Sequence, residues 1–497
     1  MKRSRRRLLR NNKTALIFCA VLLIIGAILS VVFIQPWPKA GKASKNNKTE
    51  VYEYEQYYVP INHFSDKIDT ISFAELKNKL ANESNEDVYV SADERENVRK
   101  LFNLDNFQPK VQFLGDQEIV NLVGEKSNRL AIVPFQTAGS RVKTLKVDNK
   151  LLWDKTATDY PLKLKLKTSD KSKASNAFIQ NKITLLTNVG DVILGRHVAY
   201  KMRTYNDYTH PWLKMADLLK KGDITFADLE TPLSDRVSPP DEGMSFIAPQ
   251  KSIAGLKMAG VDIVALANNH STNYGVNVFN DTLELLKKEG ISYVGGGINS
   301  EEAYRSLFIE RNGLKWGFVD FNSIIGAINA TDDSAGVAKF AIKPWAEIDD
   351  QTDIARIKIM IKETKKQADI VVAEFHWGVE YQADPIQSQV NVAHAAMESG
   401  ADLIVGTHPH VVQGAESYQG KPILYSLGNF IFDQEWSMET KQGVVAEAYF
   451  YSKKLVDIRL IPYQIEDYNQ PGLTTEDQSN QILNRIFTAS ISKEFQN

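Results

Sequence analysis

Residues 403–410 read Leu-Ile-Val-Gly-Thr-His-Pro-His. The apolar block 403–405 is typical of a short buried strand, and the two histidines fall where that strand ends and its loop begins. In open α/β sheets, ligands bind at the carboxyl ends of the strands. Two imidazoles on either side of a proline can face one small object, and a metal ion is the obvious candidate. Taken alone, the pair could equally be solvated loop residues or structural hydrogen-bonding groups.

Four further apolar blocks each lead into a polar residue that can bind a metal. They are residues 183–186 before Asp191, 224–226 before Asp228 and Glu230, 261–266 before Asn269 and His270, and 370–373 before His376. Helical patterns alternate with these blocks over residues 277–289, 353–366 and 387–399, which is the βαβ rhythm of an α/β domain. Any one of the polar residues could be a turn residue or a helix cap. Five strand ends in chain order favour a shared site on one rim.

The chemistry of these residues points to divalent ions. Carboxylates, amides and neutral imidazoles are the ligands that hold Mn, Fe, Zn or Mg. These groups are more than one four-coordinate ion needs, so we expect one or two divalent ions. Such ions activate a bound water and stabilise the oxyanion of a phosphoryl centre. His270, directly after Asn269, could supply the proton that a leaving group needs.

Composition limits the class of protein. The chain has 497 residues, enough for two or three domains, with ordinary globular contents of hydrophobic and charged residues. A net charge of -2 argues against a general nucleic-acid binder, since no basic surplus exists to neutralise phosphates. The single cysteine, Cys19, lies in the first apolar segment. It excludes an intramolecular disulfide and leaves the rest of the chain without thiolate metal ligands.

The N-terminus has the pattern of a membrane anchor. Residues 1–14 are strongly basic, and residues 15–34 contain no charge. Twenty helical residues span roughly 30 Å, the thickness of the hydrocarbon core of a bilayer. Because basic residues stay on the cytoplasmic side, the main domain is expected outside the cell membrane. The alternative is a cleaved signal peptide, whose apolar core usually has about 7–15 residues.

These patterns predict a series of segments along the chain. A cytoplasmic basic tail (1–14), a single-pass transmembrane signal anchor (15–34) and a polar tether (35–50) come first. A small accessory α+β domain (51–168) follows, in which we find no catalytic constellation. The α/β domain spans 177–465, and a helical tail spans 466–497. The polar stretch 168–176 breaks the pattern and marks the boundary between the two domains.

Six short motifs make the chain resemble a known family over about residues 183–436. They are GDVILGR (190–196), LETP (229–232), ANNH (267–270), FHWGVEY (375–381), GTHPHVVQ (406–413) and SLGNF (426–430). As a set, and in this order, they resemble the CapA-type capsule-synthesis (poly-γ-glutamate) family of the calcineurin-like metallophosphoesterase superfamily. The resemblance implies a four-layer α/β/β/α sandwich with a metal site at the strand ends.

The resemblance also implies a role for each residue of the site. Asp191 and His410 would bind the first metal, Glu230 would bridge, Asn269, His376 and His408 would bind the second metal, and His270 would be the general acid. Three neighbours are candidates for contact with substrate. Arg196 could clamp an anion or form a surface salt bridge, Glu380 could line the pocket or only pack, and Asn429 could contact ligand or cap a turn.

Two departures from the family pattern leave the function open. The first motif of the superfamily is Asp-x-His, but Ile193 stands at the histidine position, so one ligand of the first metal is missing and a one-metal site is an alternative. Asp228 stands where the family commonly has asparagine. The main hypothesis is a membrane-anchored, extracellular metal-dependent hydrolase of the phosphoesterase type.

The expected partners follow from this hypothesis. They are an anionic polymer such as poly-γ-glutamate or a phosphoester substrate, together with membrane proteins of capsule synthesis, but not nucleic acid. Two alternatives stay open. One is a non-catalytic subunit that binds or assembles the polymer with a degenerate metal site. The other is a metal-dependent amidohydrolase or transferase that acts on polyglutamate.

Overall fold

The computed structural model describes residues 50–82, 85–157, 159–341 and 351–490. Within these ranges no helix is both long and apolar enough to cross a bilayer. This finding contradicts the predicted single-pass membrane localisation, which we therefore withdraw; the predicted span 15–34 itself lies outside the described residues. All the elements below belong to the compact unit Tyr52–Asn497.

The N-terminal part of this unit is built on a six-stranded sheet with its own apolar core. In spatial order its strands are β4 (Gln112–Leu114), β3 (Asp87–Ser91), β5 (Arg129–Pro134), β1 (Tyr52–His63) and β6 (Val142–Thr144), and β8 (Lys163–Thr168) also pairs with β1. The remaining elements are α2 (Phe73–Ala81), α3 (Arg95–Leu101), α4 (Asp116–Glu125), α5 (Lys171–Ser175) and the paired β2 (Thr70–Ile71) and β7 (Lys146–Val147). The alternating leucines and lysines of β8 give a half-exposed strand, and the apolar β5 is buried, as their sequences predict.

The larger part of the unit contains two further sheets. The first has eight strands, in the order β12 (Ser292–Val294), β11 (Ile263–Ala265), β10 (Ile224–Leu229), β9 (Ile183–Val192), β22 (Gln442–Tyr451), β23 (Lys454–Glu466) and β24 (Gln470–Leu473), with β21 (Asn429–Ile431) also on β9. The second has six, in the order β14 (Leu307–Arg311), β15 (Leu314–Asn322), β17 (Ile370–His376), β18 (Leu403–Thr407), β20 (Lys421–Leu424) and β19 (Ala415–Tyr418).

Alternation along the strands places the two sheets face to face. Phe226 of β10 meets Phe318 of β15 with ring centroids 5.4 Å apart, within one apolar core that both sheets share. The neighbouring residue Ala227 points the other way, into a core that includes Leu256 and Phe279 of the covering helices. This period of two is what a strand buried on both faces requires.

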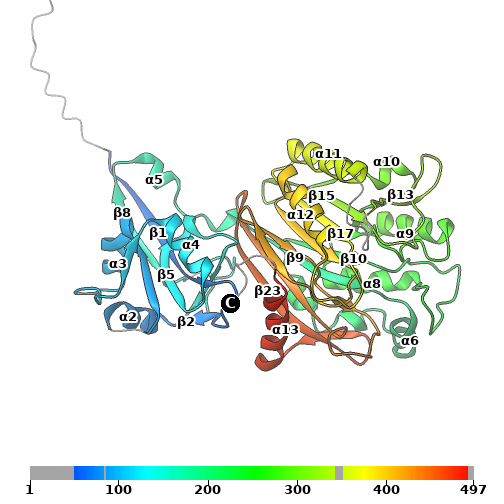
Figure 1. Ribbon diagram of the computed structural model, residues 1–497, viewed down its shortest axis with the longest axis horizontal. Coiled ribbons are helices and arrows are strands. Elements are labelled where there is room, and N and C mark those ends of the chain that lie inside the picture. The colour runs from blue at the N-terminus through cyan, green and yellow to red at the C-terminus, as the bar shows by residue number, and fades with distance from the viewer. Residues whose placement is uncertain (1–49, 83–84, 158, 342–350, 491–497) are drawn as a thin grey trace, which may run out of the picture. The chain divides into compact units, whose positions relative to one another are not determined.

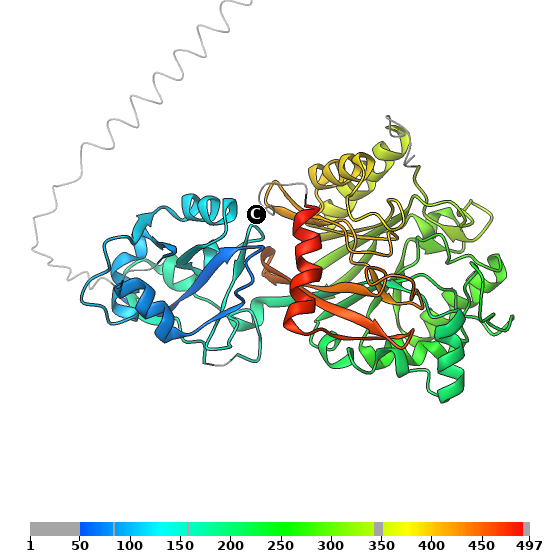
Figure 2. The ribbon, with the colours of Figure 1, turned by 60° about the horizontal axis from the view of Figure 1, so that its bottom comes forward.

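Helices cover the outer faces, as Figure 1 shows for α8, α9, α11 and α12. The α-helices of this part are α6 (Arg196–Tyr205), α7 (Ala216–Leu219), α8 (Ile253–Ala259), α9 (Val276–Glu289), α10 (Ser300–Ala303), α11 (Gln351–Gln367), α12 (Gln387–Ser399) and α13 (Glu476–Thr488). Strands β13 (Gly296–Gly297) and β16 (Gly336–Val337) form a small two-stranded sheet. The C-terminal α13 runs beside β23 (Figure 2). The predicted α/β class is thus confirmed, and the layers are those of an α/β sandwich.

The strand ends that the sequence singled out come from both sheets. β9, β10 and β11 are parallel neighbours in the first sheet, and β17 and β18 are parallel neighbours in the second. Pairing sets Asp191 beside Asp228 and His376 beside Thr407. The polar rim that we expected at the strand ends is therefore an edge where the carboxyl ends of strands from two sheets meet.

Candidate metal centre

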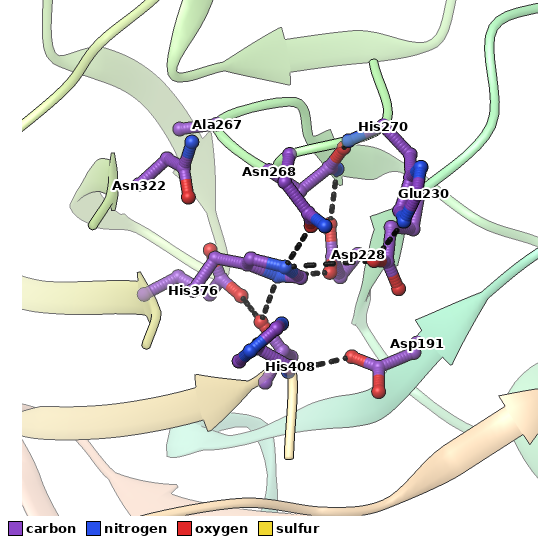
Figure 3. Close-up of polar contacts among 12 residues, drawn as sticks. Asp191, Asp228, Glu230, Ala267, Asn268, His270, Asn322, His376 and His408 are labelled. Atoms are coloured by element: carbon purple, nitrogen blue, oxygen red, sulfur yellow. Dashed lines mark hydrogen bonds and ion pairs between the residues drawn. The ribbon is translucent and has the colours of Figure 1, made fainter. Parts of the chain in front are cut away.

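Six buried side chains at this edge form two groups with the geometry of metal ligands. One group is Glu230, His408 and His410, and the other is Asp191, Asp228 and His376; in each, one ligand atom per residue lies within 4.8 Å of the others. Figure 3 shows most of these side chains pointing toward one another from the ends of β9, β10, β17 and β18. The structure therefore brings together the acids and histidines that the motifs predicted, and it adds Asp228.

The centre of the cluster contains polar atoms that the protein leaves unsatisfied. Neither carboxylate oxygen of Glu230 nor Nδ1 of His408 has a hydrogen-bond partner among the described residues, although Glu230 is completely buried. Burial raises the pKa of Glu230 well above its usual value, and the charges of Asp191, Asp228 and Glu380 add to this. A buried carboxylate without partners is unfavourable. A divalent cation is the kind of group that satisfies it.

His376 is held in one orientation by its neighbours. Its Nδ1 lies 3.0 Å from Asp228 Oδ2 and 3.0 Å from Thr407 Oγ1. The Thr407 hydroxyl donates to Glu374 Oε1 at 2.6 Å, so its own proton is used and it accepts from His376. The tautomer with its proton on Nδ1 satisfies Asp228 and leaves the lone pair on Nε2. This lone pair faces the amide oxygen of Asn269 at 2.7 Å, and two acceptors so placed fit a shared cation.

His410 is oriented in a similar way from the opposite side. Its Nδ1 lies 3.1 Å from Asp191 Oδ2 and 2.8 Å from Asn429 Oδ1. Burial lowers the pKa of His410, but these two contacts outweigh it and the net shift is upward. The Asn429 amide nitrogen donates to the backbone oxygens of His410 and Thr440 at 3.2 and 2.9 Å, and Asn429 is completely buried. Asn429 is therefore fixed in place and holds the His410 ring through its Nδ1.

His270 lies at the edge of the cluster. Its Nε2 is 3.9 Å from Glu230 Oε1, and its Nδ1 is 3.0 Å from Asn273 Oδ1. Burial lowers the pKa of His270 to about 4, so the ring is neutral near pH 7. Phe246 covers this ring at a centroid distance of 4.3 Å.

The position of the missing histidine is filled by apolar packing. Ile193 is completely buried and forms a small core with Phe246 and Phe432. His197 does not replace the missing ligand, because its ring packs on Tyr200 and Tyr468 with centroids 5.3 and 4.6 Å apart. Neither position 193 nor His197 therefore supplies an imidazole to Asp191.

Arg196 and Glu380, the other two predicted contacts with substrate, differ in their surroundings. The guanidinium of Arg196 pairs with Asp433, donates to the backbone oxygen of Gly243 at 3.0 Å and lies over the Phe246 ring at 5.0 Å. Its charge is already balanced. Glu380 is partly exposed, and its charge reaches the cluster, where it raises the pKa of Glu230.

The sequence of this chain matches a known protein family. The sequence model of the family described as bacterial capsule synthesis protein PGA_cap matches residues 185–434, which is half of the chain. The chain belongs to this family. The match begins in β9 and ends just after β21, so it contains all the strand ends that carry the candidate ligands.

Several relatives carry capsule-related names. The chain is 31% identical over 316 residues to the capsule biosynthesis protein CapA of Bacillus anthracis, covering 62% of this chain and 74% of that protein. It is 32% identical over 261 residues to the PGA biosynthesis protein CapA of Bacillus subtilis (strain 168), covering 52% and 65%. A crystal structure of a hypothetical protein from Thermus thermophilus aligns with 57% of this chain and 100% of that chain, at 17% identity and a TM-score of 0.38.

The structure adds supporting residues that sequence reasoning missed. Asp320 is buried and accepts from the backbone N–H groups of Leu266 and Ala267 at 3.0 and 2.8 Å, so it anchors the loop that leads to Asn269. Glu374, also buried, accepts from Thr407. Each acid lies between two apolar residues of its strand, Val319 and Phe321 for Asp320 and Ala373 and Phe375 for Glu374. A carboxylate in such a run rarely lies unpaired, and that signal could have found them.

Proposed function

We propose that this chain is a metal-dependent hydrolase of the phosphoesterase type that acts in the biosynthesis of a capsule polymer such as poly-γ-glutamate. Membership of the capsule synthesis family and the names of the two Bacillus relatives support the role in biosynthesis. The observation that supports the chemistry is the buried cluster of metal-binding groups in which neither carboxylate oxygen of Glu230 nor Nδ1 of His408 has a hydrogen-bond partner among the described residues.

The donor set fits hard or borderline divalent ions. Asp191, Glu230, Asn269, His376, His408 and His410 would hold them. When bound, one or two such ions (Mn, Fe, Zn or Mg) would supply an activated water and balance charge on a phosphoryl group. Asp228 fixes the proton of His376 on Nδ1, and Asn429 does the same for His410. Both histidines then present Nε2, which is the usual arrangement of a ligating imidazole with a supporting acceptor.

His270 is suited to move a proton at the edge of the cluster. Its Nδ1–H is used by Asn273, and its Nε2 faces Glu230. To act as the general acid, the ring must first take up a proton on Nε2 and then give it to the leaving oxygen. This proton transfer should accelerate hydrolysis most when the leaving group is unstable as an anion.

The second candidate function is non-catalytic and uses the same fold. Ile193 fills with apolar packing a position that the superfamily uses for a metal ligand. This favours a subunit that binds or assembles the polymer. Hydrolysis or transfer at an amide of the polymer would use the same activated water. It is a third candidate function for this cluster. The predicted partnership with capsule-synthesis membrane proteins stays a prediction.

One assay separates these functions. The purified full chain is stripped of metal with EDTA, loaded with Mn, Zn, Fe or Mg, and given bis(p-nitrophenyl) phosphate or polyglutamate. We expect metal-dependent release of p-nitrophenol that His408→Ala reduces at least about 100-fold, with His394→Ala, a histidine paired with Glu416 outside the cluster, as the control. Cleavage of polyglutamate alone would favour the amide reaction. Inertness with every ion would favour the binding subunit.

A further inference from the structure

Large apolar side chains are exposed on the loops around the metal cluster. Ile325 is 83% exposed, Met244 67% and Trp436 60%. Ile328, Tyr274 and Tyr381 are also exposed. Single exposed apolar residues are ordinary in soluble proteins, but several in segments that touch one site call for an explanation. We refer to these six residues as the apolar rim.

The first rim segment, Ile325–Ile328, lies against the loop that carries a candidate ligand. A methyl group added at Gly326 would lie 3.5 Å from the backbone oxygen of Asn269. The backbone N–H of Ile328 donates to the hydroxyl of Thr272 at 2.8 Å. Ile325 is therefore fixed close to Asn269 while its side chain stays in solvent.

The second rim segment lies beside the candidate general acid. The Tyr274 hydroxyl donates to the backbone oxygen of Ser245, the residue after Met244, at 3.5 Å. The next backbone N–H, that of Phe246, donates to Asn273 Oδ1 at 2.7 Å, and the Phe246 ring covers His270. Met244 and Tyr274 therefore belong to segments that are fastened directly around His270.

The third rim segment lies beside His410. The Tyr381 ring is 6.2 Å from the His410 ring and 6.1 Å from that of Trp436, centroid to centroid. The backbone N–H of Tyr381 donates to the oxygen of Pro409 at 2.8 Å, and its hydroxyl accepts from Gln434 at 3.2 Å. These contacts hold Tyr381 in a left-handed conformation with φ of +64°, which is unusual for an aromatic residue.

The charges of these segments do not suit a polyanionic chain. Arg196, which donates to Gly243 beside Met244, is paired with Asp433. Lys441 is paired with Glu435, next to Trp436. Both basic side chains are thus already neutralised by acids of the protein. A polyglutamate chain that crossed these segments would have to compete for them, whereas a hydrocarbon would not.

We propose that the substrate of this site is an amphiphilic phosphoester, whose phosphoryl group enters the metal cluster and whose hydrocarbon part packs on the apolar rim. This inference rests on the proposed phosphoesterase function. Isoleucine and methionine side chains offer no hydrogen bonds, so they suit a hydrocarbon better than a sugar or a peptide. The polymer then enters the reaction sequence at another point, and this site acts on a lipid-like phosphoester.

A series of substrates tests the proposal. Methyl, butyl and octyl p-nitrophenyl phosphodiesters are compared with the metal-loaded full chain, below their micelle concentrations. We expect KM to fall as the chain lengthens, by at most about fourfold per methylene, because each buried methylene contributes about 0.8 kcal/mol. In the double variant Ile325→Ser/Trp436→Ser, KM for the octyl ester should rise toward that for the methyl ester. Leu473→Ser on β24, 64% exposed, is the matched control and should keep the full dependence.

Equal KM values for the three esters in the wild type, or an unchanged dependence in the double variant, would overturn the proposal. A binding measurement separates this outcome from failure of the phosphoesterase function. Octyl phosphate should bind the metal-loaded chain at least tenfold more tightly than methyl phosphate by calorimetry, even if no ester is hydrolysed. Equal affinities would reject the rim, and loss of hydrolysis with retained preference for octyl phosphate would reject only the catalytic function.

Discussion

Replacement of Glu230 by leucine should stabilise the metal-free protein. Glu230 is completely buried, both of its carboxylate oxygens lack hydrogen-bond partners among the described residues, and Asp191 and Asp228 are close enough to oppose its charge. An unsatisfied buried polar group costs about 1–3 kcal/mol, and a charged one costs more. Glu230→Leu removes this cost with a side chain of similar size. We therefore expect the free energy of unfolding in EDTA to rise by about 1–3 kcal/mol.

Bound metal offsets or reverses this difference in stability. Free metal at about 100 times its Kd adds about 2.7 kcal/mol to the stability of a protein that binds it only when folded. Wild type should gain this stabilisation, and Glu230→Leu should lose most of it because a central ligand is gone. Urea unfolding followed by tryptophan fluorescence, with EDTA or with added Mn, measures both effects on the same samples.

A second buried glutamate provides the control. Glu416 is as buried as an ordinary core residue, but its oxygens accept from the Tyr425 hydroxyl and from His394, at 2.8 and 2.7 Å. Glu416→Leu leaves these donors unpaired and should destabilise by about 1–3 kcal/mol, with or without metal. The reasoning is refuted if Glu230→Leu also destabilises in EDTA, or if metal stabilises it as much as wild type.

Three further predictions concern the surroundings of the cluster. Asp228→Ala removes the acceptor that fixes His376 and should weaken metal binding about 10–100-fold, measured by calorimetry; unchanged affinity would mean that Thr407 alone orients the ring. His270→Ala should slow hydrolysis of an alkyl leaving group about 100-fold but that of p-nitrophenol much less, because a good leaving group needs no proton; equal losses would remove the general-acid role. Thr407→Val should lower metal affinity less than Asp228→Ala, since it leaves the carboxylate in place; a larger loss would make Thr407 the main support.

The residues of the candidate site could be predicted because each lies in a short motif at the end of an apolar strand. Asp191, Glu230, Asn269, His376 and the histidines of residues 408–410 all have this local context. The structure brings their side chains to one place. Sequence periodicity identified the strands, but it carries no information on which sheet a strand joins. The expectation of two sheets came from the family resemblance and not from this periodicity.

Long-range pairing explains what the sequence alone did not reveal. The partner of Arg196 is Asp433, 237 residues away, and nothing local indicates that its charge is balanced. Asp320 anchors the Leu266–Ala267 backbone from a different sheet. The absence of histidine at position 193 was visible in the sequence. Its replacement by an apolar cluster with Phe246 and Phe432 required the fold.

Calorimetric titration of the EDTA-stripped full chain with Mn tests the central claim most directly. If the buried acceptors around Glu230 form a metal centre, one or two ions should bind, and Glu230→Leu should abolish the heat of binding. Absence of binding in the wild type with Mn, Zn, Fe and Mg would contradict the metal centre and every hydrolytic function built on it.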